Sequence, residues 1–519
     1  MPTLPRSAIV TLVAAVAAAC GGGCSDDSST GGAGGVAATG GMGGTVATGG
    51  TGASTSTGGA GGSAGTSTVT SLTKDGITWT FAAPILAGQF VTGDYFAVGP
   101  VTVSAIDPAP TGSDPYMNGS VVNLPTADSK SGFDSRLNDG SDESWWFDPA
   151  VRKYPPIVLQ PGDALVSSRS LDTPHTIPEV MRSGDMNVSP VASDSVLTVL
   201  AAVPPSDAFR PSYCDRSQTL YRAGDLQRNL LPSHAPPNPD MTPTLAQFEE
   251  WFRRPWIDLS PFNFDVPAEY MPGYGAQVAA AVGFASLTLM LDQPADQKVA
   301  LTNYLVQYGI DLFGCVNAGY GWPGFGGHRS GRKLPIVLAG VLLGDAAMQS
   351  VSATYPDQFG EDMQTVYVAD IPGGYTSAWQ GATVIYGGHY GVHPDGTPVS
   401  ADPLYGPYEQ LQPAQWPILD PPGEQLGEAY RRCLTSLVWV GEALAVHLLA
   451  AESAWNYPAF FDYVDRWMTE DDTQAVADVL AQSGYDYSSG WDRQRQTAGY
   501  FQGGFPQYSF VDDMWAAYR

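Results

Sequence analysis

Basic residues are scarce in this chain of 519 residues. Lysine and arginine together number 24, against 52 aspartate and glutamate residues, which gives a formal net charge of −28 at pH 7. A protein that binds nucleic acid needs a basic surface to neutralise the phosphates. The composition therefore argues against a nucleic-acid partner and favours an acidic surface.

Cysteine is sparse as well, with five residues in the chain. Neither a C-x-x-C pair nor an H-E-x-x-H sequence occurs, so we predict no metal site and no cofactor. His389 and His393 have an H-x-x-x-H spacing, but the glycines around them argue against the helix that would place both on one face. One disulfide is possible in the folded part, and its pairing stays open among Cys214, Cys315 and Cys433.

Long apolar runs are missing too, and no apolar run has the length and flanking residues of a membrane span. Residues 1–20 instead combine Arg6, a short apolar stretch and the ending Ala-Ala-Ala-Cys20. This ending resembles the lipobox of bacterial lipoproteins, which implies a lipid on the Cys20 sulfur and membrane contact through that anchor only. The resemblance implies export to the bacterial cell envelope, at the outer membrane or the cell surface. Cys24 is a second candidate, and without lipidation the segment is an ordinary signal peptide.

The remaining sequence changes character twice before the helical part begins. Residues 21–69 are mostly glycine, serine, threonine and alanine, which cannot bury enough surface to offset chain entropy. This composition predicts a flexible tether. From residue 70 to 235, short runs rich in valine, isoleucine, threonine and aromatic residues alternate with turn-forming residues, which predicts a β-sandwich-like domain.

The pattern becomes helical from residue 244 to 519. Residues 275–291 and 334–350 are apolar on nearly every side, which predicts buried helices. Helices joined by aromatic loops rich in glycine and proline favour packed helical hairpins, and the predicted fold class is α+β, multidomain. Further helices are expected over 293–313, 427–452, 458–467 and 472–482.

This order of domains resembles the α/α-toroid carbohydrate-active enzymes, which include polysaccharide lyases and glycoside hydrolases. The resemblance is one of layout, an N-terminal β-sandwich followed by helical hairpins, and it covers most of residues 70–519. No family motif aligns residue by residue. The resemblance implies a polysaccharide or oligosaccharide substrate, although a fold alone does not determine a function.

A glycine-rich aromatic loop over residues 319–333 carries four basic or titratable residues just before an apolar helix. Cations at this end of a helix face the positive end of its dipole, and a helix start usually has Ser, Thr, Asp or Asn. These residues therefore indicate a role other than capping. The alternative is a solvated loop whose cations pair with the many acids.

A second loop lies within a tyrosine-rich insertion over residues 366–425. A loop of this length is usually functional or disordered, and its aromatic content argues against disorder. Loops from different hairpins of a toroid meet at one mouth, so we expect residues 319–333 and 386–393 to converge.

Lyase chemistry accounts best for these residue types. A polysaccharide lyase removes the C5 proton of a uronic sugar and expels the oxygen at C4, which requires a base, a proton donor and a cation for the sugar carboxylate. The predicted catalytic residues are His328, Arg332, Tyr390 and His389. The predicted substrate-binding residues are Arg329, Lys333, Trp322, Tyr386 and Trp379.

Two other functions stay open. A glycoside hydrolase needs two carboxylates across a glycosidic bond. No pair stands out by spacing, although the acidic overall charge favours this alternative because it repels a polyanion at long range. A non-catalytic glycan-binding lipoprotein would use aromatic platforms alone. The carboxylate candidates are Asp265, Glu269, Asp345, Glu424, Glu428 and Glu442.

Overall fold

The computed structural model of the chain describes residues 65–126, 130–137, 147–176, 188–259, 271–272, 274–402, 404–417, 427–428, 431–472, 474–475, 477–478 and 506–519. The predicted signal peptide with Cys20 and most of the predicted tether lie outside the described residues. The same holds for the carboxylate candidates Asp265, Glu269 and Glu424. These predictions stay predictions.

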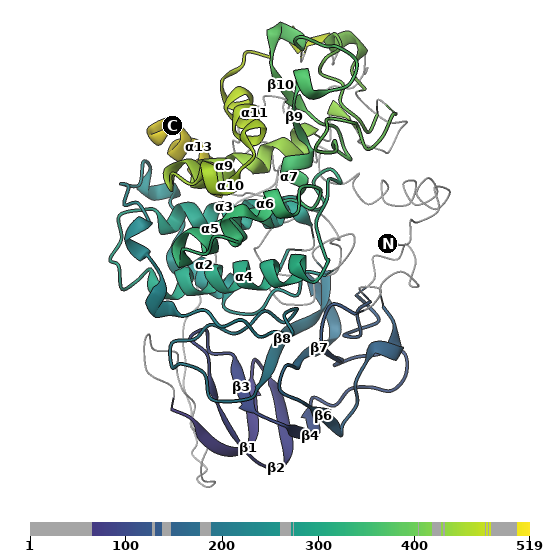
Figure 1. Cartoon of the computed structure of the whole chain (residues 1–519), viewed down its shortest axis with the longest axis vertical. Coiled ribbons are helices and arrows are strands. Elements are labelled where there is room, and N and C mark those ends of the chain that lie inside the picture. The colour runs from purple at the N-terminus through teal and green to yellow at the C-terminus, as the bar shows by residue number, and fades with distance from the viewer. Residues whose placement is uncertain are drawn as a thin grey trace, which may run out of the picture.

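The N-terminal part folds into one curled sheet of eight strands, drawn at the bottom of Figure 1. Seven strands follow the order β5-β7-β8-β3-β2-β4-β6, and β1 pairs with β2. β3 and β8 are parallel, whereas the other pairs are antiparallel. The strands are β1 (Ser67–Lys74), β2 (Ile77–Gln89), β3 (Tyr95–Val98), β4 (Val101–Asp107), β5 (Ser120–Val122), β6 (Ile157–Leu159), β7 (Ala164–Thr176) and β8 (Val188–Leu200).

The strands form because apolar and polar residues alternate along them. In β2, Ile77, Trp79 and Phe81 are buried while the threonines between them are partly exposed, which is the period of a half-buried strand. β1 begins at Ser67, so the last residues assigned to the tether already belong to the sheet. The polar composition of Ser67–Val69 does not predict a strand. These residues belong to the sheet because they pair with Ala87–Ile85, not because their side chains are buried.

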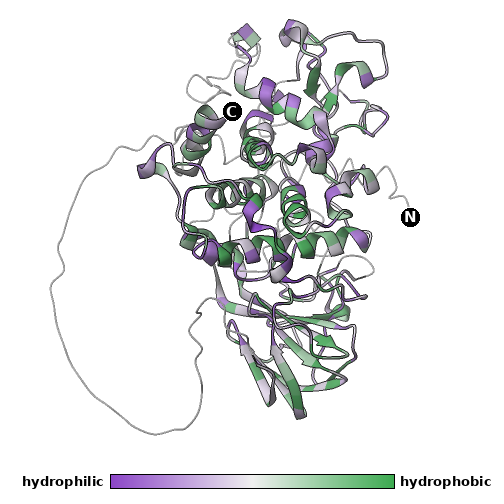
Figure 2. Cartoon of the chain, turned by 60° about the vertical axis from the view of Figure 1, so that its left-hand side comes forward, coloured by the Kyte–Doolittle hydropathy of each residue, from purple (hydrophilic) through white to green (hydrophobic). Residues whose placement is uncertain are grey.

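The C-terminal part is helical and occupies the middle and top of Figure 1. Its central helices are predominantly hydrophobic in Figure 2, and every residue of α3 is buried. No helix of the described residues is long and apolar enough to cross a membrane. The helices are α2 (Leu245–Phe252), α3 (Gly275–Leu289), α4 (Val299–Asn317), α5 (Lys333–Leu343), α6 (Val351–Thr354), α7 (Gly360–Met363), α9 (Trp439–Leu448), α10 (Glu452–Trp455), α11 (Pro458–Thr469) and α13 (Pro506–Tyr518).

The long helix predicted over residues 334–350 is shorter than expected. α5 ends at Leu343 because Gly344 takes a left-handed conformation with φ 68°, which stops the helix. The Asp345 carboxylate then accepts the backbone N–H groups of Ala347 and Met348 and starts a new turn. The helix predicted over 427–452 is also divided, since five residues of π-helix, Arg431–Thr435, precede α9.

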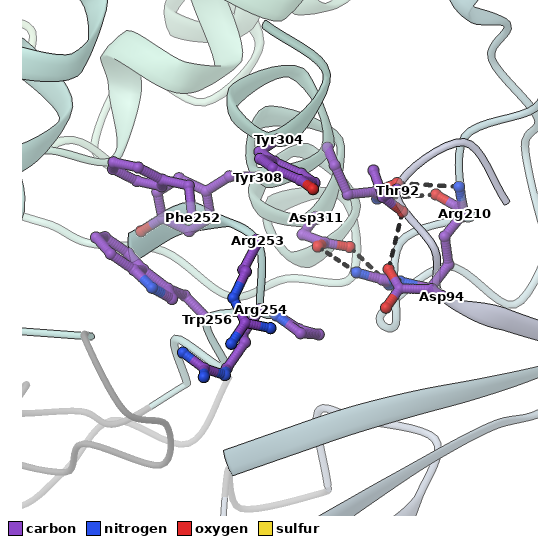
Figure 3. Close-up of a pocket in the computed structure, with 12 residues that line it drawn as sticks. Thr92, Asp94, Arg210, Phe252, Arg253, Arg254, Trp256, Tyr304, Tyr308 and Asp311 are labelled. Atoms are coloured by element: carbon purple, nitrogen blue, oxygen red, sulfur yellow. Dashed lines mark hydrogen bonds and ion pairs between the residues drawn. The ribbon is translucent and has the colours of Figure 1, made fainter. Parts of the chain in front are cut away.

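The sheet and the helices are joined by buried charges and a disulfide. Arg210, which is fully buried, pairs with Asp94 from the β2–β3 turn and with Asp311 of α4, at 2.9 and 2.6 Å (Figure 3). Cys214 and Cys315 form a disulfide next to this network. The segment that leaves the sheet is therefore fixed to α4 at several points.

The mixed strands and helices confirm the α+β class. The finer predictions of a β-sandwich and an α/α-toroid stay predictions, as do the domain boundaries. Within the insertion, β9 (Thr365–Tyr367) and β10 (Val384–Tyr386) form a small antiparallel hairpin. Figure 1 shows this hairpin beside α11, at the end of the molecule opposite the eight-stranded sheet.

Candidate functional site

The two loops predicted to converge lie side by side. The ring centroids of His328 and His389 are 6.4 Å apart, and the backbone N–H of Gly326 donates to the His389 oxygen at 2.6 Å. Phe325, in the first loop, packs between residues of the two loops. Its ring centroid lies 4.6 Å from that of His328 and 5.5 Å from that of Tyr390. The predicted convergence is therefore confirmed.

Four partly exposed residues form a row above the two histidines. The Tyr390 ring stacks between Phe325 and Tyr405, with centroids 5.5 and 5.1 Å away. The Arg329 guanidinium lies over the Phe325 ring at 5.7 Å, a distance at which a cation is attracted to the ring face. The row therefore combines stacked rings, two phenols and one cation, all of them partly exposed.

The two histidines lie beneath this row. His328 is 2 % exposed and His389 is 5 % exposed. Burial lowers the pKa of His389 to about 3, because the charged imidazolium would lose its hydration. His389 is therefore a neutral imidazole at neutral pH. Burial and the neighbouring Tyr405 raise the pKa of Tyr390 to about 12, so Tyr390 keeps its phenol proton.

Arg332 and Lys333 have structural partners in the core. The Arg332 guanidinium is fully buried and forms two hydrogen bonds with the Asp258 carboxylate, at 2.7 and 3.0 Å. The Lys333 ammonium lies 2.5 and 2.7 Å from the two Asp362 oxygens and 4.3 Å from the centre of the Trp455 ring. These buried pairs argue against the catalytic role predicted for Arg332 and the substrate contact predicted for Lys333, because both charges are already neutralised away from solvent.

The predicted aromatic contacts are also mostly internal. Trp322 is 1 % exposed and packs against Tyr320 and Phe359. Tyr386 is 2 % exposed and accepts a hydrogen bond from Gln364 at 3.2 Å. This burial argues against Trp322 and Tyr386 as sugar platforms. Trp379 is partly buried elsewhere in the insertion, where its ring packs against that of Trp416.

A short segment that no sequence pattern indicates holds both loops. This anchor segment consists of α7 and the following Gln364. The Gln364 amide nitrogen donates to the backbone oxygens of Gly388 and His389, at 3.3 and 3.1 Å. The Met363 sulfur accepts the Gly324 N–H at 3.2 Å, and the Met363 backbone oxygen accepts the Val392 N–H at 2.7 Å. Figure 1 shows α7 between the central helices and the β9–β10 hairpin.

The described hydrolase candidates have other surroundings. Glu428 is fully buried and pairs with Arg431 and Arg432, at 2.7 Å each. Asp345 caps the turn after α5, and Glu442 lies in the core of α9 with no exposed surface. The described members of this set do not form an accessible pair across which a glycosidic bond would fit. Among the described residues, no three His, Cys, Asp or Glu side chains are grouped as a metal site.

A separate cleft lies where the sheet meets the helices. Its walls include Arg253, Arg254, Trp256 and Tyr304 (Figure 3). Its arginines are paired, since Arg253 lies 2.9 Å from Glu250 and 3.1 Å from Asp75. The lining of the cleft includes tyrosines but no histidine, unlike the two loops.

The fold and the site define an α+β protein with a histidine, tyrosine and arginine cluster on converging loops. No protein-family model matches the chain, and neither a curated protein nor a solved structure matches it significantly. We therefore infer the chemistry from the residues of the site.

Proposed function

We propose that the protein is an exported, lipid-anchored carbohydrate-active enzyme, a polysaccharide lyase that cleaves a uronic-acid-containing glycan by β-elimination. The observation that carries the proposal is the meeting of His328, His389 and Tyr390 beside Arg329, from two loops distant in sequence. The lipobox-like ending at Cys20 supports the anchor and the envelope location. The layout of a β-sandwich followed by an α/α-toroid belongs to the same proposal.

The reaction assigns a distinct role to each group. His389, a neutral imidazole, takes the C5 proton of the uronic sugar. The C5–H electron pair forms the C4=C5 double bond as the C4–O4 bond breaks. Tyr390 donates its proton to the leaving oxygen, a role that suits a phenol with a raised pKa better than that of a base. The elimination written in this way is balanced in atoms and electrons without water, a metal ion or a redox partner.

Arg329 supplies the positive charge that the sugar carboxylate needs. Its side chain is partly exposed, unlike those of Arg332 and Lys333. A guanidinium binds a carboxylate in a bidentate way and stabilises the enolate-like charge that develops as C5 loses its proton. In a chain of net charge −28, this local cation acts at short range, because salt screens the remaining field beyond about 8 Å.

The test is product analysis with the chain from residue 21 onward, which lacks the signal segment with Cys20 and keeps β1 intact. It is incubated with uronic and neutral polysaccharides. Absorbance from an unsaturated uronate is expected. Reducing ends without that absorbance would support a hydrolase instead. The variants His389→Gln, Tyr390→Phe and Arg329→Met should each lower turnover at least about 100-fold, the usual scale for an acid–base group.

His393→Gln is the matched control for these variants. It removes a histidine from the same insertion, and the His393 side chain is 48 % exposed. Turnover should stay unchanged. Wild-type rates in all three site variants would contradict the assignment.

A glycan-binding lipoprotein is the second candidate, favoured by the partly exposed Tyr390–Tyr405 stack. Aromatic side chains stack on sugar faces without any acid–base group. Retention on a glycan column that is lost in Tyr405→Ala, with no product from any polysaccharide, would establish binding in place of catalysis.

A further inference from the structure

Two buried carboxyl groups below the His328 loop have no countercharge of their own. Glu361 of α7 and Glu442 of α9 are both fully buried. Within the described residues, Oε2 of Glu361 and both carboxyl oxygens of Glu442 have no hydrogen-bond partner. Native proteins rarely leave such groups unsatisfied, so each one requires an explanation.

The charges around this pair are matched elsewhere. Arg332 is neutralised by Asp258, and Lys333 is neutralised by Asp362. An ionised carboxylate in the core without a counterion is very unfavourable, so such a group tends to keep its proton. Glu361 and Glu442 therefore share the weak attraction that Arg332 and Lys333 still provide for an ionised carboxylate.

Glu361 is tied directly to the candidate catalytic loop. Its Oε1 accepts the Gly331 backbone N–H at 2.5 Å. Gly331 has φ 96° and lies so close to α3 that a Cβ atom would come within 2.3 Å of the Ala279 nitrogen. The loop thus rests against α3 on one side, and Glu361 holds it from the other.

We propose that Glu361 is a positioning residue for the His328 loop, and that loss of its buried proton strengthens its hold on the Gly331 amide. An N–H bond to a carboxylate is about twice as strong as one to a neutral acceptor. When Glu361 is protonated, the bond weakens and the loop is less tightly fixed. The inference rests on the proposed function only for the loop's catalytic role, because the proton and the amide bond are properties of the fold.

The surroundings of Glu361 determine the pH at which it loses its proton. Burial raises the pKa of Glu361 to about 7, and hydrogen bonds from the backbone, including that of Gly331, oppose the rise. The facing groups are Asp362, Lys333 and Arg332 near α5 and α7, and Glu442 from α9. Burial, and then the charge of Glu361, raises the pKa of Glu442 well above its ordinary value, which favours the protonated form of Glu442.

The amide signal of Gly331 reports this bond without any assay of activity. The dipeptide Ser-Gly occurs five times in the sequence, so labelling serine carbonyl carbon with ¹³C and glycine nitrogen with ¹⁵N leaves five candidate signals. The full chain from residue 21 onward is used, and pH is varied from about 5.5 to 8.5. In the wild type, one Ser-Gly amide proton should move downfield with a midpoint near the pKa of about 7.

Two isosteric variants assign the titration. Glu361→Gln should abolish the shift, whereas Glu442→Gln, which mimics protonated Glu442, should retain it. A Gly331 signal that is constant across this range in the wild type, or that still titrates in Glu361→Gln, would overturn the proposal. If the shift is found but no glycan is cleaved or bound, the positioning role holds and the proposed function fails.

Discussion

The amide nitrogen of Gln364 lies 3.1 Å from the backbone oxygen of His389, in a part of the core where Gln364 has no exposed surface. The same nitrogen also lies within hydrogen-bond distance of Tyr386 Oη and the Gly388 oxygen. One buried amide thus holds the second loop against the anchor segment that fixes the first. The relative position of the two histidines depends on it.

Removing this amide should destabilise the protein. In Gln364→Leu the Gly388 oxygen loses its donor from Gln364, and the His389 oxygen keeps only the Gly326 N–H. The free energy of unfolding should fall by about 1–3 kcal/mol. Urea unfolding followed by tryptophan fluorescence measures the difference. Gln410→Leu is the matched control, because Gln410 is only partly buried and donates one hydrogen bond, to the Pro407 oxygen. Equal losses in both variants would contradict the anchoring role.

The buried Arg332–Asp258 pair leads to a second prediction. Arg332→Met should cost about 3–5 kcal/mol, because it leaves the Asp258 carboxylate buried without its cation. Arg332→Met combined with Asp258→Asn should recover part of that loss, since neither charge then remains. Arg222→Met is the surface control, because Arg222 is 52 % exposed in its pair with Asp207 and a solvated pair contributes little to stability. A double variant no more stable than Arg332→Met would contradict the pairing.

The placement of Arg332 also shows how far the sequence could predict this site. The cations at the start of α5 were conspicuous because they oppose the helix dipole, and α5 does begin at Lys333 without a side-chain cap. Their partners were not visible, because Asp258 lies 74 positions from Arg332 and Asp362 lies 29 positions from Lys333. The choice between a substrate clamp and a buried ion pair is made by tertiary packing, which no local pattern encodes.

The convergence of the two loops was easier to predict from the sequence than the anchor segment that holds them. Glycine and aromatic residues in both loops indicated packed, irregular structure, and Phe325 and Tyr390 do pack together. The anchor segment is only a four-residue helix followed by one glutamine, and neither has a periodicity that distinguishes it. Its importance comes from contacts across the core, such as that between Met363 and Gly324.

The disulfide between Cys214 and Cys315 gives a third prediction. The bridge closes a loop across 101 positions, for which chain entropy implies a stabilisation of about 5 kcal/mol. Cys214→Ser with Cys315→Ser should lower the free energy of unfolding by up to that amount, measured in denaturant without reductant. Peptide mapping under non-reducing conditions should recover the bridge intact from the wild type and from Cys433→Ser. A bridge to Cys433 in the wild type would contradict the assigned pairing.

Glu361 makes the stability of the fold depend on pH in a direction opposite to that of its bond with Gly331. Its pKa is about 7 in the folded chain and 4.5 as an ordinary glutamate, so between these values the folded state binds more protons than the unfolded state. The free energy of unfolding therefore falls as pH rises through this window, by up to about 3 kcal/mol from this group. Glu361→Gln has no such proton to lose, and its advantage over the wild type should grow from pH 5 to pH 8. Denaturant unfolding of both proteins at the two pH values measures this, with the fully exposed Asp395→Asn as a control that should follow the wild type. A constant difference between wild type and Glu361→Gln would show that Glu361 titrates alike in the folded and unfolded chains, against the effect of its burial.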